Sequence, residues 1–91
     1  MTKLELISFD KSGWEDYCYW KSQDKKTVKK IDSLIEQIFR DPFGGIGKPE
    51  ALKGDLSGFW SRRINDKDRI IYTIDNRSLV IVACRGHYDD R

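Results

Sequence analysis

The second half of the chain contains three short runs with β-branched, aromatic and other apolar residues, at 59–64, 69–74 and 79–84. Only four polar residues separate each run from the next, at 65–68 and 75–78. Runs of this length and composition are typical of β-strands, and connections this short join neighbouring antiparallel strands. No other feature constrains the fold as strongly, because this pattern predicts an antiparallel meander of three strands.

The first half predicts one strand followed by two helices. Residues 4–9 alternate well enough for a half-buried strand. Ser12 and Glu15 have the spacing of a capping box, which predicts a first helix with Ser12 as its N-cap. Asp24 is a second N-cap candidate, and apolar residues then recur at three- and four-residue intervals over 28–39. The two helices are close enough in sequence to form a helical hairpin.

Length and composition predict a single domain over residues 1–91. A chain of 91 residues has room for one core, and the 38% hydrophobic and 12% aromatic content is sufficient to form it. The order of elements predicts an α+β fold, because helices packed on one face of an antiparallel sheet bury both apolar surfaces. We therefore expect an N-terminal strand and a helical hairpin packed on an antiparallel sheet.

The cysteines and the hydropathy pattern predict a cytoplasmic protein. Cys18 and Cys84 lie in apolar surroundings, which indicates buried free thiols in a reducing compartment. No stretch approaches the roughly 18 apolar residues of a membrane span, and no secretory signal pattern begins the sequence. The net charge of +2 does not by itself indicate a nucleic-acid binder.

Several kinds of site are disfavoured by spacing. The Gly- and Pro-rich segment 42–49 is not a phosphate-binding loop, because Gly47-Lys48 is followed by Pro49. One histidine and two separated cysteines match no zinc spacing, so neither a metal nor another cofactor is expected. A nucleophilic triad is also disfavoured, because neither cysteine is expected to be exposed.

The remaining possibility is acid/base chemistry without a metal. Glu50 lies beside the Gly-rich segment, and His87 follows the most apolar run, 79–84. Histidine exchanges protons near neutral pH, since its unperturbed pKa is about 6.5. The candidate cations are Lys53, Arg62, Arg63, Arg69 and Arg85. RNA can be cleaved by a base, cations that stabilise the phosphorane and an acid that protonates the leaving oxygen. The alternative is that these arginines are ordinary surface charges, which is the commonest role of any single arginine.

Six segments together resemble a known family. They are Asp16-Tyr17 with Tyr19-Trp20, Val28-Lys29-Lys30-Ile31, Gly47-Lys48-Pro49-Glu50 with Leu52-Lys53, Leu56-Ser57-Gly58-Phe59-Trp60-Ser61-Arg62-Arg63-Ile64, Arg69 with Tyr72, and Ala83-Cys84-Arg85 followed by His87-Tyr88. The sequence resembles the YoeB branch of the RelE-like toxins over nearly its whole length. These are ribosome-associated messenger-RNA interferases of bacterial type II toxin–antitoxin pairs.

The resemblance implies a fold and a division of roles. The expected fold is the RelE-like one, which agrees with the α+β prediction above. Glu50 would be the general base, His87 the general acid, Arg69 the phosphate-stabilising arginine and Tyr88 an orienting or stacking group. Supporting contacts with RNA and the ribosome would come from Lys53, Arg63, Arg62, Arg85 and Lys48. The reaction implied is metal-independent endoribonuclease cleavage, which inhibits translation.

The resemblance also implies partners, and it leaves alternatives. The partners would be messenger RNA in the ribosomal A site, ribosomal RNA and proteins, a YefM-like antitoxin and, as one possibility, a second copy of the chain. One departure is the acidic tail, because Asp89 and Asp90 follow the terminal His-Tyr pair and would repel RNA. A non-catalytic module that blocks ribosomes or joins an operon repressor is the alternative function. A DNA-binding domain is a weaker reading, since the lysines at 25–30 fit phosphate contact or a solvated face better than base reading.

Overall fold

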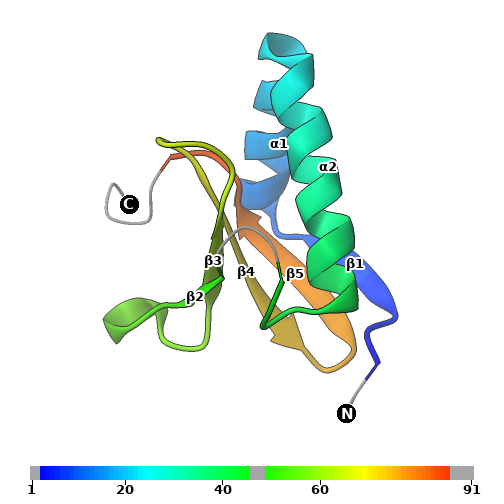
Figure 1. Cartoon of the computed structure of the whole chain (residues 1–91), viewed down its shortest axis with the longest axis vertical. Helices are drawn as coiled ribbons and strands as arrows, with labels where there is room; N and C mark the ends of the chain where they lie inside the picture. The colour runs from blue at the N-terminus through cyan, green and yellow to red at the C-terminus, as the bar shows by residue number, and fades with distance from the viewer. Residues whose placement is uncertain (1–2, 46–48, 87–91) are drawn as a thin grey trace.

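The protein forms two layers, a five-stranded sheet and a helical hairpin that lies against one face of it (Figure 1). The structure is a computed structural model, and it describes residues 3–45 and 49–86. The strands lie in the order β1-β5-β4-β3-β2. The elements are β1 (Leu6–Phe9), α1 (Lys11–Gln23), α2 (Lys25–Arg40), β2 (Glu50–Ala51), a short 3-10 helix (Gly54–Leu56), β3 (Trp60–Arg63), β4 (Arg69–Asp75) and β5 (Ser78–Ala83).

The first helix begins earlier than the sequence predicts. Asp10, and not Ser12, is the N-cap, and its carboxylate accepts a hydrogen bond from the backbone N–H of Gly13 at 2.7 Å. The expected capping box of Ser12 and Glu15 is therefore wrong, and both residues lie inside α1. Aspartate caps a helix as well as serine does, so the two candidates could not be separated by residue type.

The second helix is capped as predicted. Asp24 accepts hydrogen bonds from the backbone N–H of Lys26 at 3.0 Å and from the side-chain hydroxyl of Thr27 at 2.8 Å. The bond from the Thr27 hydroxyl is the main reason why the pKa of the Asp24 carboxyl lies below its usual value. The same residue ends α1, because its backbone N–H donates to the carbonyl of Trp20. One aspartate therefore sets the corner of the hairpin.

The main core lies between the helices and the sheet. From α2 it takes one apolar stripe at helical spacing, formed by Ile31, Leu34, Ile35 and Ile38. From the sheet it takes alternate positions of β4 and β5, namely Ile70, Tyr72, Leu79 and Ile81. A smaller cluster of Leu52, Ile71 and Ala83 covers part of the opposite face. The alternation along β4 and β5 thus gives the sheet a helix-covered face and a more open one, and a register shift between Ile71 and Tyr72 places Ala83 on the open face although it is two positions after Ile81.

The meander of β3, β4 and β5 is antiparallel, as predicted, but the whole sheet is mixed. β1 pairs with β5 in parallel, from Leu6 opposite Ser78 to Phe9 opposite Ile81. No pairing direction was predicted for the N-terminal strand, so the parallel edge is an addition to the predicted antiparallel sheet. The chain crosses the face of the sheet through the helical hairpin before it returns, and parallel neighbours require such a crossover. At the other edge, β2 is a two-residue strand that was not predicted.

Helix α1 approaches β5 very closely at Gly13. A Cβ on this residue would lie far inside van der Waals contact with the carbonyl oxygen of Ile81 and 3.0 Å from its carbon. That oxygen already accepts a hydrogen bond from the backbone N–H of Asp10 at 3.0 Å. Cys84, which is fully buried, lies against the same helix with its sulfur 3.8 Å from the Gly13 carbonyl oxygen. The start of α1 is therefore fixed on the last strand.

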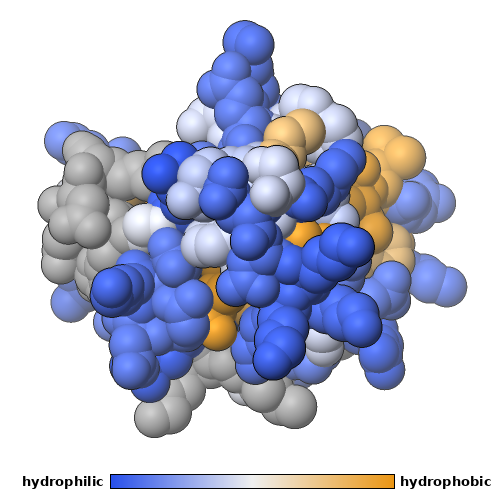
Figure 2. Space-filling view, turned by 90° about the horizontal axis from the view of Figure 1, so that it is seen from above, coloured by the Kyte–Doolittle hydropathy of each residue, from blue (hydrophilic) through white to orange (hydrophobic). Residues whose placement is uncertain are grey.

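The outer surface is mainly hydrophilic. Figure 2 shows charged and polar side chains over most of the upper face, with a hydrophobic area on the side where β1 lies in Figure 1. The large apolar side chains that are exposed are Leu6, Ile7, Trp14 and Phe43. Among the described helices, none is both long enough and apolar enough to cross a membrane.

Candidate functional site

The register of three strands brings the candidate carboxylate and two candidate arginines onto one face of the sheet. Glu50 in β2 is paired with Ser61 in β3, and Arg63 in β3 is paired with Arg69 in β4. Ser61 and Arg63 are two positions apart and therefore share a face. Ser61 is also paired with Ile71, which belongs to the small cluster opposite the helices. The site therefore lies on the more open face.

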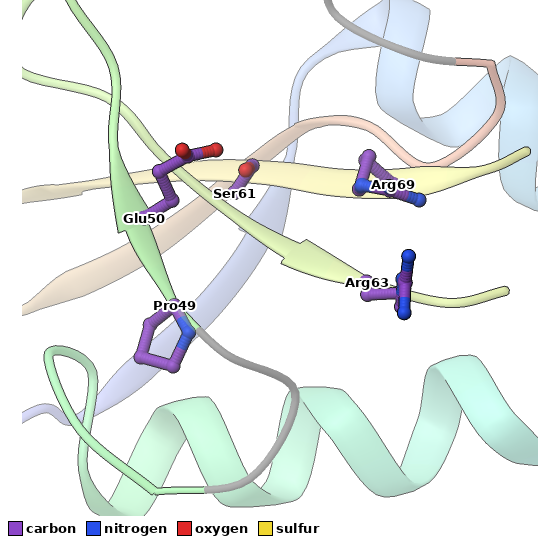
Figure 3. A pocket seen from close by; sticks show the side chains of 5 residues that line it. All are labelled: Pro49, Glu50, Ser61, Arg63 and Arg69. Atoms are coloured by element: carbon purple, nitrogen blue, oxygen red, sulfur yellow. The ribbon is translucent and has the colours of Figure 1, made fainter. Parts of the chain in front are cut away.

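These side chains line an open hollow of about 370 Å³. Its lining is formed by Pro49, Glu50, Ser61, Arg63 and Arg69. Figure 3 shows the carboxylate of Glu50 at one end and the side chains of Arg63 and Arg69 at the other, with Ser61 between them. Sequence reasoning predicted Glu50 and both arginines, and it missed Pro49 and Ser61. The alternation of β3 offered a signal for Ser61, since it places this residue beside Arg63.

The two arginines are suited to bind an anion. They lie directly opposite each other on adjacent strands, where like charges destabilise a sheet. Arg69 is oriented by hydrogen bonds from its Nη1 to the carbonyl oxygens of Asn65 at 2.6 Å and Asp68 at 3.1 Å. Arg63 is half exposed and lies 4.0 Å from a carboxylate oxygen of the exposed Asp66. A phosphate placed between the guanidinium groups would remove their repulsion and accept hydrogen bonds from both.

The end of the described chain is fixed beside Arg69. The backbone N–H of Arg69 donates to the carbonyl oxygen of Gly86 at 2.9 Å, and the N–H of Gly86 donates to the Asp68 carboxylate at 2.7 Å. Gly86 has a φ of 80°, a conformation that glycine adopts without strain. His87 and Tyr88, the predicted acid and its aromatic neighbour, lie outside the described residues, as does Lys48.

Arg62 does not lie where the sequence analysis put it. It was expected among the cations that contact RNA, but its side chain is fully buried on the helix-covered face. Its Nε donates to the hydroxyl of Tyr72 at 3.2 Å, and its Nη2 donates to the carbonyl oxygen of Asp41. The reason is strand alternation, because Ser61 and Arg63 point to the hollow and the residue between them must point away.

Tyr72 connects the buried arginine to the segment that leads to the hollow. Its ring is fully buried, and its hydroxyl donates to the carbonyl oxygen of Pro42. Burial raises the pKa of this phenol above its usual value, although the neighbouring Arg62 opposes the change. The hydroxyl therefore stays protonated and remains a hydrogen-bond donor. Sequence reasoning assigned no role to Tyr72.

Two further predicted cations, Lys53 and Arg85, do not line the hollow. Lys53 is exposed and precedes the 3-10 helix that follows β2. Arg85 is exposed, and its guanidinium carbon lies 3.6 Å from the centre of the Tyr19 ring, a cation–π contact. Both cysteines are free thiols; Cys84 is buried as predicted, whereas Cys18 is only half buried. In the part of the chain that the structure describes, no group of three or more His, Cys, Asp or Glu side chains could hold a metal ion.

Comparison with known proteins identifies the family. The model of the YoeB-like toxins of bacterial type II toxin–antitoxin systems matches residues 9–88. The chain belongs to this family. Toxin YoeB of Synechocystis is 55% identical over 82 residues, which are 90% of this chain and 95% of the relative. Toxin YoeB of Escherichia coli K12 is 52% identical over 85 residues, which are 93% of this chain and 100% of the relative.

Solved structures share the fold. A YoeB/ParE toxin from Agrobacterium tumefaciens superposes with a TM-score of 0.88 at 42% identity, covering 92% of this chain and 100% of that one. A YoeB dimer from Staphylococcus aureus has a TM-score of 0.85 at 45% identity, covering 96% and 100%. The heterotetrameric YoeB–YefM complex of that organism gives 0.83 at 45% identity, with the same coverage. These likenesses confirm the predicted α+β, RelE-like fold and the family resemblance.

Proposed function

We propose that the protein is an endoribonuclease that cleaves messenger RNA in the ribosomal A site and thereby stops translation. The observation that carries the proposal is the hollow in which Glu50 faces Arg63 and Arg69. A carboxylate and two guanidinium groups around one open space provide a base beside a site for a phosphodiester. Membership of a toxin family supports a harmful activity of this kind.

The proposed reaction is an attack of the RNA on its own backbone. Glu50 takes the proton of the 2′-hydroxyl, the 2′-oxygen forms a bond to phosphorus, and the bond to the 5′-oxygen breaks. Arg69, with support from Arg63, stabilises the charge that builds up on the phosphorane. His87 gives its proton to the departing 5′-oxygen, and Tyr88 orients the substrate. The bonds that hold Gly86 beside Arg69 support this assignment, because Gly86 directly precedes His87.

The test is single-turnover cleavage of messenger RNA on programmed ribosomes, with ribosome binding measured separately. Glu50→Gln and His87→Gln should each lower the rate roughly 100- to 10,000-fold while binding is kept, the usual span for a base or an acid. Arg69→Ala should remove about 2–4 kcal/mol of transition-state stabilisation. Arg77→Ala is the matched control, since this exposed arginine pairs with Glu5, away from the residues that line the hollow. Wild-type rates for all three site variants would reject these residue assignments, whereas ribosome binding by the wild-type protein without any cleavage would leave the non-catalytic binding module as the function.

The proposed chemistry needs no metal, because the base, the cations and the acid are all side chains. Cleavage should continue in excess EDTA when other polycations keep the ribosomes intact. Activity that disappears in EDTA and returns with one specific divalent ion would overturn the metal-independent mechanism. The ribosomes should be assayed for peptide-bond formation in parallel, so that loss of the substrate is not mistaken for loss of the enzyme.

We also propose a YefM-like antitoxin as the partner that silences the toxin, and a dimer as a possible state. The solved YoeB–YefM complex and YoeB dimer of Staphylococcus aureus support these proposals. Co-expression with the product of a neighbouring short acidic reading frame should give a stable complex without ribonuclease activity. Light scattering of the complex and of the free chain measures both stoichiometries. The same complex can be tested for binding to its own operator, which examines autorepression.

A further inference from the structure

A buried pair of side chains holds the segment that leads into the hollow. Arg62 and Tyr72 come from neighbouring strands and bind the carbonyl oxygens of Asp41 and Pro42, directly after α2. The pair is joined by the bond from Arg62 Nε to the Tyr72 hydroxyl at 3.2 Å. Both side chains are fully buried. Groups buried this deeply have no contact with water. Breaking one of these hydrogen bonds would therefore leave a buried polar group without a partner, which destabilises the fold.

Further contacts hold residues 41–45 against Arg62 and the strand β3. A Cβ on Gly45 would be 3.6 Å from Nη1 of Arg62, so the backbone passes directly over the guanidinium. Gly45 has a φ of 85°, which other residues adopt only with strain. The centre of the Phe43 ring lies 5.0 Å from the centre of the Trp60 ring in β3. Residues 41–45, which we call the strap, therefore lie against β3.

β2, which carries Glu50, is the shortest of the described strands. β2 contains only Glu50 and Ala51, and two residues of pairing fix a strand weakly. After β2 the chain is held by Leu52, which is buried and whose N–H donates to the carbonyl oxygen of Phe59 at 2.9 Å. The strap ends at Gly45, and residues 46–48 between it and Pro49 lie outside the described chain. The described path from Arg62 to Glu50 is therefore β3, in which Ser61, next to Arg62, pairs with Glu50.

We propose that Arg62 and Tyr72 are positioning residues for Glu50, through which they act on the cleavage rate. This inference rests on the proposed function, because it assigns the pair an effect on the base step. Arg62 also lies between Ser61 and Arg63, so the bonds that hold the strap simultaneously hold the strand that carries the floor of the hollow. A base displaced by about 1 Å can lose on the order of 100-fold in rate.

The test variant is Tyr72→Phe, which keeps the buried ring and removes only the hydroxyl. We expect single-turnover cleavage to fall on the order of 10- to 100-fold, with unchanged ribosome binding. In a Glu50→Gln background the same change should cost nothing further, because two residues that act through one step are not additive. Arg62→Lys is a second variant, which keeps the charge but cannot reproduce the paired donors, and it should give the same pattern.

The control is Ile31→Val, a core change in α2 that lines no part of the hollow. It should lower the melting temperature without the loss of rate. A wild-type rate in Tyr72→Phe, an additive loss in the Glu50→Gln background, or an equal loss of rate in Ile31→Val would each overturn the positioning role. If Glu50→Gln alone kept the wild-type rate, the base assignment would fail, and the positioning role with it. A loss in Glu50→Gln without one in Tyr72→Phe would reject the positioning role alone.

Discussion

Replacing Gly13 by alanine should destabilise the protein, although alanine is the better helix former. In α1 the change gains about 1 kcal/mol of helix propensity. Against this, the new methyl group would overlap the Ile81 carbonyl oxygen and lie 3.0 and 3.2 Å from two further backbone carbons of β5. All three atoms belong to the backbone of the sheet and cannot rotate away, so the helix itself must move.

The expected magnitude follows from these two opposing effects. Overpacking a rigid site costs about 1–3 kcal/mol, and a clash with strand backbone belongs at the upper end of this range. Subtracting the gain in helix propensity leaves a loss of about 2 kcal/mol. For a domain of this size, that loss lowers the melting temperature by roughly 10 °C. Moving α1 also stretches the bond from Asp10 N–H to the Ile81 carbonyl oxygen, which is 3.0 Å long.

Urea unfolding followed by circular dichroism and by tryptophan fluorescence measures the change. Ser12→Ala is the matched control, because Ser12 precedes Gly13 in the same turn, is exposed and should change the free energy of unfolding by less than about 0.5 kcal/mol. If Gly13→Ala were as stable as Ser12→Ala, α1 could leave β5 without cost. The argument from close approach would then be wrong.

Three further predictions concern the helices. Ile35→Ala should lower the free energy of unfolding by about 2–4 kcal/mol, whereas the exposed neighbour Glu36→Ala should not, as thermal melts would show. Burial, reinforced by the hydrogen bond to Asp32, raises the pKa of Tyr17 to about 12. Asp32→Asn should bring tyrosinate absorbance on at lower pH, and an unchanged titration would contradict this cause. Asp24→Ala should lower the free energy of unfolding by its full amount above pH 3.8, the usual pKa of the carboxyl group, and by progressively less as the pH falls below that value. The reason is that the pKa of the Asp24 carboxyl is lowered in the folded protein.

The parts of the fold that follow from local pattern could be predicted. The apolar stripe of α2, the cap at Asp24 and the three strands of the meander each depend on neighbours within a few positions. The parallel pairing of β1 with β5 could not, because Leu6 and its partner Ser78 are far apart in the sequence and no local pattern records the direction. The N-cap of α1 was missed because two good capping residues compete within three positions.

The site shows the same division. Glu50, Arg63 and Arg69 were predicted, and the register of β2, β3 and β4 brings them together. The error at Arg62 was avoidable, since Ile64 and Trp60 share its face and are apolar, which indicates that this face points inward. The contacts of Tyr72 could not be seen in the sequence, because its hydroxyl donates to the carbonyl oxygen of Pro42, 30 positions away, and accepts from the side chain of Arg62. The functions of His87 and Tyr88 remain predictions.

The position of β5 in the sheet has a consequence for how the protein folds while it is being synthesised. β5 pairs with both β1 and β4, receives α1, and leads to Gly86 beside Arg69. Of the described elements it is also the last to be translated. A nascent chain that lacks it has an N-terminal strand without its neighbour in the sheet, a first helix without the strand it packs on, and no Gly86 bonded to Arg69. The ribosome that makes the protein therefore completes nearly the whole described chain before the backbone of Arg69 can bond to Gly86.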